Sequence, residues 1–372
     1  MSVTERHFEQ LRHQGFTIIE NVVSEEQCDI WLREYNAWLD QFKGNKWPFT
    51  VHSPINTYNN GYLETTWKAR LATKAVFSKL WSTDKLVSTI DGIVIRRPPQ
   101  IDGDCFDSPG KHLLHCDQKY RKKGLHAYHG NLFVEQADDE DWTLHIMERS
   151  HLFIDEFFET HKDAAISSHM KKYYPMTSED MQWFKSKGCT CMRIKRPKGG
   201  MLIRDARMIH ANAAPKDNRK HPDRWRFVLL ACMIPAIWAS NCDIEKIRKA
   251  YTKLVMTTHW PINGFDMLKC KIPPSCRRNA HLIPTEHSET AKSQTAKEIC
   301  GVIPYDFKDG KSNGPDWTPV WREDPMPRDT NVNRELKLNF IGFVIIGLSL
   351  CVAFLTNIVY KYLRLYSLSI IF

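Results

Sequence analysis

The pattern that most limits the fold is a series of short, β-branched and apolar segments separated by turn residues. These candidate strands are Phe16–Ile19, Val87–Arg96, Asn131–Gln136, Thr143–Met147, Gly200–Arg204 and Arg226–Met233. Helical periodicity appears behind a capping box at residues 24–27, and again over Phe153–His169 and Ser178–Ser186. An early helix followed mainly by strands with turns between them predicts a β-sandwich or barrel supported by helices.

Composition narrows the class of protein further. The formal charge is +9, but Lys and Arg are spread along the chain without a dense basic stripe, which disfavours nucleic acid as a partner. Eleven cysteines, an odd number without framework spacing, and a polar, charged start at residues 1–10 indicate a reducing compartment. We therefore expect the folded region to lie in the cytosol.

His-x-Asp triplets are the chemical motif of interest, and the chain has three: His115/Asp117, His161/Asp163 and His221/Asp223. The second lies in a helical pattern, where residues two apart point to different faces. The third lies in a polar run between two prolines, which is typical of a solvated turn. Only the first is followed, at a suitable distance, by a further histidine and then by arginines at the start of a strand.

The first triplet and His210 form a candidate metal site. Two imidazoles and one carboxylate can occupy one face of an iron(II) ion and leave three positions open for a chelating cosubstrate and dioxygen. Arg226 opens an apolar strand after His210, and Arg224 has the same strand parity. Either guanidinium could bind the far carboxylate of the cosubstrate through a bidentate pair of hydrogen bonds.

Four stretches, in order along the chain, resemble the phytanoyl-CoA dioxygenase family of iron(II)- and 2-oxoglutarate-dependent oxygenases. They are residues 15–24 (GFTIIENVVS), 93–99 (IVIRRPP), 130–151 (from GNLFVEQ to ERSH) and 199–210 (GGMLIRDARMIH). The chain departs from the family pattern at Arg149, where a glycine is usual, and in the longer spacing from His210 to the arginines.

The resemblance implies a mostly β fold with flanking helices, a double-stranded β-helix (jelly-roll, cupin-like), over residues 1–272. It implies iron(II) held by His115, Asp117 and His210, and 2-oxoglutarate as cosubstrate, with ascorbate as an optional accessory. Arg226 or Arg224 would bind 2-oxoglutarate, and Arg97, which matches the basic residue before the family's two prolines, would contact it as well.

The implied reaction is hydroxylation of a small or lipid-like molecule with dioxygen. Two alternatives remain open from the sequence. One is a catalytically inactive jelly roll that serves as a binding or scaffolding module at a membrane, and the other is a hydroxylase that modifies proteins.

The C-terminal region has a different composition. Residues 273–336 are rich in polar residues and proline, which predicts a partly disordered stalk. Residues 338–360 are 23 consecutive residues without a charge, long enough for a transmembrane helix, and residues 361–372 would form a short tail. We therefore expect a single-pass, tail-anchored membrane protein.

Overall fold

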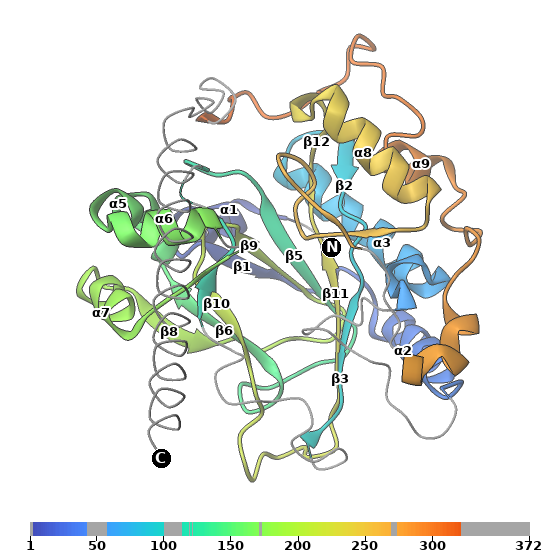
Figure 1. Ribbon diagram of the computed structural model, residues 1–372, viewed down its shortest axis with the longest axis horizontal. Helices are drawn as coiled ribbons and strands as arrows, with labels where there is room; N and C mark the ends of the chain where they lie inside the picture. The colour runs from blue at the N-terminus through green and yellow to red at the C-terminus, as the bar shows by residue number, and fades with distance from the viewer. Residues whose placement is uncertain are drawn as a thin grey trace, which may run out of the picture. The chain divides into compact units, whose positions relative to one another are not determined.

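The framework of the protein is a pair of antiparallel five-stranded sheets (Figure 1). The structure is a computed structural model that describes residues 3–42, 58–99, 114–118, 120, 122–170, 173–268 and 274–320. The major sheet has the order β1 (Phe16–Ile19), β9 (Met201–Asp205), β5 (Tyr128–Phe133), β11 (Arg226–Ala231), β3 (Ile93–Arg96). The minor sheet has the order β7 (Tyr174–Pro175), β4 (His115–Cys116), β10 (His210–Ala213), β6 (Thr143–Glu148), β8 (Thr190–Arg193).

The path of the chain between the two sheets defines the topology. From β3 to β6 successive strands alternate between the major and minor sheets, and after β8 they alternate again from β9 to β11. This alternation between two sheets is the topology of a jelly roll. It agrees with the mostly β fold with flanking helices that the sequence predicted.

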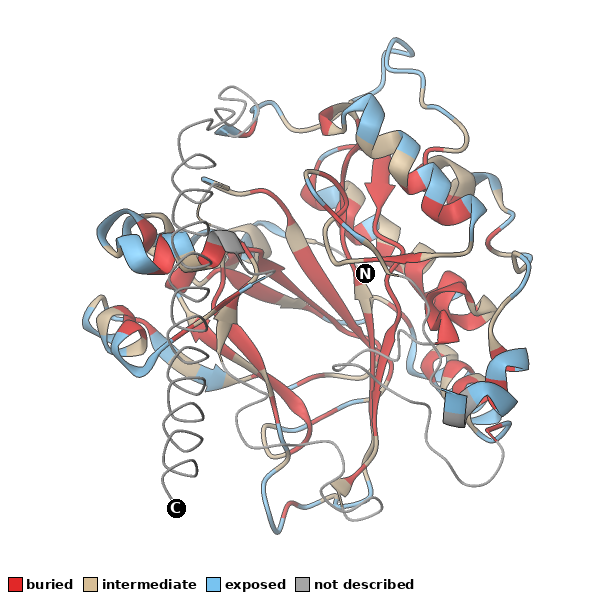
Figure 2. Ribbon diagram, viewed as in Figure 1, coloured by how far each residue is buried: buried red, intermediate tan, exposed pale blue. Residues whose placement is uncertain are grey.

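Successive side chains along each strand of the major sheet point to opposite faces of that sheet. Ile203 and Leu229 belong to the core shared with the helices, whereas Leu202 and Val228 belong to the core between the sheets. Figure 2 shows the resulting buried band through both sheets. By the same alternation, polar side chains of β5, β9 and β11 enter the space between the sheets.

Helices cover the outer faces of the two sheets. The layer beside the major sheet contains α2 (Glu25–Leu39), α3 (Glu64–Leu80), α8 (Asn241–Thr252) and α9 (Gln294–Ile299). The layer beside the minor sheet contains α5 (Ile154–Thr160), α6 (Lys162–Met170) and α7 (Ser178–Ser186). The helix α1 (Glu5–His13) leads into β1. Two small ribbons complete the fold: β2 (Leu86–Ser88) with β12 (Met233–Pro235), and β13 (Met256–Thr257) with β14 (Met267–Leu268).

Some predicted elements are divided in the structure. The predicted strand Val87–Arg96 is two strands, β2 and β3, and Arg226–Met233 extends across β11 and β12. Arg149, at the position where the family has glycine, adopts the left-handed conformation that glycine favours, with φ 67°. The turn is therefore retained despite the substitution.

The prediction of a partly disordered stalk is corrected over residues 274–320. Here Ala296, Ile299 and Cys300 are fully buried, and the ring of Trp317 lies 5.4 Å from that of Trp238. Lys85 Nζ contacts Asp309 Oδ1 at 2.5 Å. The prediction from polar composition was wrong here, because a few small apolar residues and specific polar pairs are enough to pack a polar segment against an existing core. The described residues up to 320 accordingly belong to one compact unit.

The predicted membrane span falls outside the described residues. Among the helices that the structure does describe, none combines the length and the hydropathy needed to cross a bilayer. Residues 338–360 and the tail at 361–372 are not among them.

Candidate metal centre

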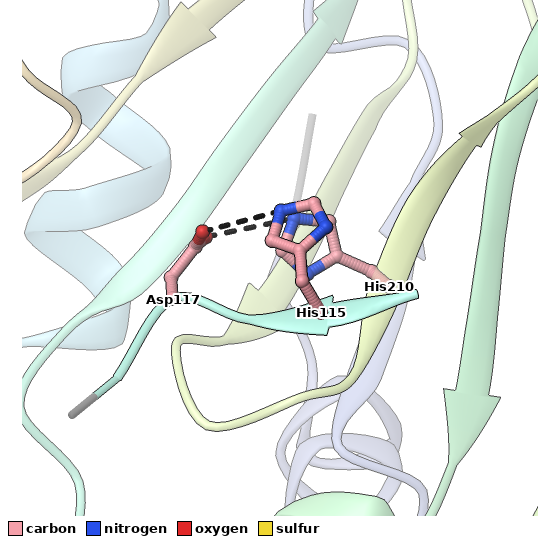
Figure 3. A group of neighbouring side chains, drawn as sticks. All are labelled: His115, Asp117 and His210. Atoms are coloured by element: carbon pink, nitrogen blue, oxygen red, sulfur yellow. Dashed lines mark ion pairs between the residues drawn. The ribbon is translucent and has the colours of Figure 1, made fainter. Parts of the chain in front are cut away.

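Three side chains from separate parts of the sequence meet between the sheets (Figure 3). His115 on β4 and His210 on β10 are direct partners across the minor sheet, and their ring centroids are 4.4 Å apart. Asp117 follows β4 immediately and points to both rings. Its Oδ1 lies 3.5 Å from His115 Nε2, and its Oδ2 lies 3.5 Å from His210 Nε2. Ligand atoms at these separations can share one metal ion with bonds near 2 Å.

The protonation states of the three groups suit metal binding. His210 Nδ1 lies 3.1 Å from the carbonyl oxygen of Met208, which can only accept a hydrogen bond, so Nδ1 carries the proton and Nε2 is left to bind a metal. Burial, together with Arg204, lowers the pKa of His210 well below its ordinary value. Burial alone would raise the pKa of Asp117, but His210, His115, His129 and Arg204 hold it well below its ordinary value. The site therefore presents a neutral imidazole at His210 and an ionised carboxylate at Asp117.

The major sheet supports this carboxylate from the opposite side. Arg204 on β9 and His129 on β5 are register partners, and both are buried. Arg204 donates from its NH2 to Asp117 Oδ2 at 3.0 Å, and His129 Nδ1 lies 3.4 Å from the same oxygen. The metal ligands come from the minor sheet region, whereas the charges around Asp117 come from the major sheet.

A second polar region between the sheets contains arginines. Arg226 is 2% exposed, and its NH1 donates to Asn212 Oδ1 at 2.7 Å. Its register partner across the sheet is Arg96, whose guanidinium lies 5.3 Å from the centre of the Trp142 ring. Burial, reinforced by Arg196 and Arg96, lowers the pKa of Arg226 well below its ordinary value. Among the described residues no carboxylate forms an ion pair with Arg226.

The other two predicted arginines lie elsewhere. Arg224 precedes β11 and binds the acidic turn instead, with NH1 at 2.7 Å from Asp141 and 3.1 Å from Asp138. Arg97 lies just past the end of β3, half-buried, and its carbonyl accepts a hydrogen bond from Trp142. The residue that enters the space between the sheets is its neighbour, Arg96.

The two remaining His-x-Asp triplets do not contribute to this centre. His161 lies between α5 and α6, with its ring stacked on Phe157 at 4.5 Å. His221 lies in the turn before β11, where its carbonyl accepts a hydrogen bond from the backbone of Arg224. Neither triplet lies at the metal centre, as predicted, but His161 stands in a break between two helices rather than inside the single helix predicted over Phe153–His169.

Sequence reasoning missed Arg96, Arg204 and the supporting role of His129. A signal was present in β9, where Arg204 interrupts an apolar strand two residues after Leu202. A charged residue on the buried face of a strand indicates a partner inside the protein. Which partner it meets depends on pairing across both sheets, which the sequence does not give.

Comparison with known proteins supports the fold. No family model matches the chain. Ava biosynthesis cluster protein O of Aspergillus versicolor is 25% identical over 272 residues, which cover 68% of this chain and 85% of that protein. The crystal structure of GlcNAc Inducible Gene 2 (GIG2, DUF1479) from Candida albicans matches with a TM-score of 0.53 at 14% identity, over 82% of this chain and 78% of that one. EvdO2 from Micromonospora carbonacea var. aurantiaca, complexed with 2-oxoglutarate, matches with a TM-score of 0.40 at 15% identity, over 63% of this chain and 91% of that one.

The similarity to GIG2 covers 82% of this chain. At 14% identity it concerns the fold alone. The chain thus combines a fold shared with GIG2 and a site of two histidines and one aspartate, partly buried between the sheets, that can hold a metal ion.

Proposed function

We propose that this protein is an iron(II)- and 2-oxoglutarate-dependent oxygenase of the phytanoyl-CoA dioxygenase type. The observation that carries the proposal is the convergence of His115, Asp117 and His210 inside a jelly roll, with the buried Arg226 farther along the same interior. Two imidazoles and one carboxylate with open positions are the donor set that non-haem iron(II) oxygenases use.

The distance between the two polar regions fits a short dicarboxylate. His210 and Asn212 are two residues apart on β10, which corresponds to about 7 Å along a strand. Arg226 donates to Asn212, so its guanidinium ends at that level. This spacing is comparable with the length of a five-carbon diacid. 2-Oxoglutarate would reach the metal with its keto acid end and Arg226 with its other carboxylate.

Each residue has a defined task in this mechanism. Bound iron(II) and 2-oxoglutarate would together supply the activation of dioxygen that no side chain can provide. His115, Asp117 and His210 would hold the metal, and a donor set of this kind leaves positions for a cosubstrate and dioxygen. Arg226 fixes the far carboxylate and thereby the orientation of the keto acid. The apolar residues between the sheets, such as Leu202 and Val228, keep bulk water away from the reacting groups.

The substrate that we propose is a small or lipid-like molecule. A role in small-molecule chemistry is supported by the relative from Aspergillus versicolor, which is named as a biosynthesis cluster protein. We further propose that residues 338–360 anchor the protein in a membrane and leave the oxygenase in the cytosol, because these 23 residues carry no charge and have Lys337 and Lys361 on either side. If so, deletion from residue 338 onward releases the protein from the membrane pellet into the soluble fraction.

The test of the activity uses the full chain with iron(II) and 2-oxoglutarate. Anaerobic addition of both should produce a weak visible charge-transfer band, and admission of air should yield succinate. His115→Ala should abolish both signals, whereas His221→Ala, which alters another His-x-Asp triplet, should leave them intact. A wild-type protein that binds iron(II) but gives neither the band nor succinate would refute the proposal.

A further inference from the structure

Asp117 is held by little local structure of its own. It follows β4, which has two residues, and the segment after it is a turn rather than a strand. Gln118 fastens this turn by donating from Nε2 to the carbonyl of Gly124 at 2.9 Å. The side chain of Asp117 itself has to be oriented by contacts from elsewhere, because its carboxylate can rotate freely about its last bond.

Arg204 provides the strongest of these contacts. It is 4% exposed, and its NH2 lies 3.0 Å from Asp117 Oδ2. Among the described residues this is the one ion pair that Arg204 makes, and its Nε and NH1 have no hydrogen-bond partner there. A guanidinium that served only to stabilise the fold would be expected to use more of its five donors. The geometry therefore directs this arginine to one carboxylate oxygen.

His129 contacts the same oxygen and is itself supported from behind. Its ring centroid lies 4.2 Å from that of His259, and His259 Nδ1 lies 2.6 Å from Asp91 Oδ2. The ring of Trp260 packs edge-on against His129 at 5.1 Å. This backing restricts movement of His129 away from Asp117. Arg204 and His129 together form one wall of the metal site on the major sheet.

We propose that Arg204 is a positioning residue that fixes the carboxylate of Asp117 so that it offers one oxygen to the metal. With Oδ2 engaged by the guanidinium, Oδ1 faces His115 and is available as the ligand. Without Arg204 the carboxylate could turn and offer both oxygens, which would fill a position that the cosubstrate needs. This inference rests on the proposed function in that it assumes a divalent metal at the site.

Cobalt(II) is a suitable probe because its visible absorption reports the number and kind of ligands, independently of turnover. Wild type, Arg204→Met, Arg204→Lys and Arg207→Met would be titrated anaerobically with cobalt(II). Arg207 is the matched control: it lies three residues away and pairs with Asp205 at 2.8 Å rather than with a metal ligand. Circular dichroism and thermal unfolding identify variants that do not fold.

We expect Arg204→Met to weaken cobalt(II) binding about 10- to 100-fold, the usual effect of removing a partner of a metal ligand, and to alter the absorption spectrum. Arg204→Lys should lose less affinity but still show an altered spectrum, because an ammonium group restrains the carboxylate less than a planar guanidinium. Arg207→Met should match wild type in both measurements.

The outcomes separate this inference from the proposed function. If wild type binds no divalent metal, the proposed function itself fails. If wild type binds cobalt(II), and folded Arg204→Met shows an unchanged spectrum or binds more tightly, Arg204 does not position Asp117. Should Arg204→Met fail to fold, an unchanged spectrum in Arg204→Lys would overturn the inference.

Discussion

Arg204 and Arg226 are both buried arginines that face the space between the sheets, yet their surroundings are opposite. Arg204 has a permanent anionic partner, Asp117, at 3.0 Å. Arg226 has an amide partner, Asn212, and other arginines nearby. A buried charge without a counter-charge is costly and is normally compensated. Arg204 thus has its counter-charge within the candidate metal site, whereas Arg226 has none among the described residues.

The largest effect should come from substituting one of the metal-binding residues beside Arg204. His210→Ala removes one of three metal-binding groups, so we expect the affinity for iron(II) or cobalt(II) to fall at least about 1,000-fold and succinate formation to disappear. Isothermal titration with cobalt(II) measures this directly. His161→Ala is the control, and equal losses in both variants would show that the metal binds elsewhere.

The second-largest effect tests whether Arg226 binds the carboxylate of 2-oxoglutarate. Arg226→Met leaves the carboxylate of 2-oxoglutarate without its partner, which should cost about 3 kcal/mol, or about 100-fold in affinity. The KM for 2-oxoglutarate should rise accordingly, while metal affinity stays the same. Arg224→Met, which alters the pairs with Asp138 and Asp141, should leave that KM unchanged. A larger loss in Arg224→Met than in Arg226→Met would reverse the assignment.

The third prediction compares the two arginines in the metal-free protein without 2-oxoglutarate. Arg204→Met removes one partner of a buried pair and should lower the free energy of unfolding by about 2 kcal/mol. Arg226→Met removes an uncompensated charge and should leave the stability unchanged or raise it by about 1 kcal/mol. Urea unfolding of both variants tests the contrast. If both variants lost the same free energy of unfolding, Arg226 would have a structural partner that stabilises the fold as much as Asp117 does through Arg204.

The smallest effect concerns pH and the buried imidazole of His126. Burial, together with Lys122, lowers the pKa of His126 to about 3. The unfolded chain binds a proton near pH 6.5 whereas the folded protein does not, so stability is full above pH 6.5 and is lost as pH falls towards 3. Between pH 6.5 and pH 5 this residue should cost about 2 kcal/mol, at about 1.4 kcal/mol per pH unit.

His126→Gln should therefore make the free energy of unfolding less dependent on pH between 6.5 and 5. Urea unfolding at several pH values provides the measurement, with His221→Gln as a control in a surface turn. An unchanged slope in His126→Gln would show that His126 titrates normally in the folded protein.

The strand pattern allowed much of the fold to be predicted, but not its details. The helix α7 was predicted from its helical period with its observed bounds, Ser178–Ser186, and in the structure Thr177 caps its start. The predicted strand over Val87–Arg96 failed at its centre, where Thr89–Gly92 interrupts the pairing between β2 and β3. Local propensity does not reveal such a break, because each half pairs with a different part of the β11–β12 segment.

The arginines show the same limit at the level of single residues. Arg224 stayed a candidate beside Arg226 because residues two apart on a strand point to the same face. In the structure β11 begins at Arg226, so Arg224 is not on the strand and this alternation does not apply to it. The resemblance pointed to Arg97, the basic residue directly before the prolines, whereas strand alternation places Arg96 between the sheets. One residue of difference reverses the face to which a side chain points.

The sequence by itself determined which chemical groups are available: a histidine and an aspartate at fixed spacing, a distant histidine, and arginines near the start of a strand. It also determined the β-rich class of the fold, because hydrophobic period and turn residues are local properties. Only the tertiary structure decided that Arg204 and His129 meet Asp117, that Arg226 lacks an acidic partner among the described residues, and that residues 274–320 pack on the core. These facts depend on register between strands far apart in the chain, and register arises from the packing of the whole interior rather than from any one segment.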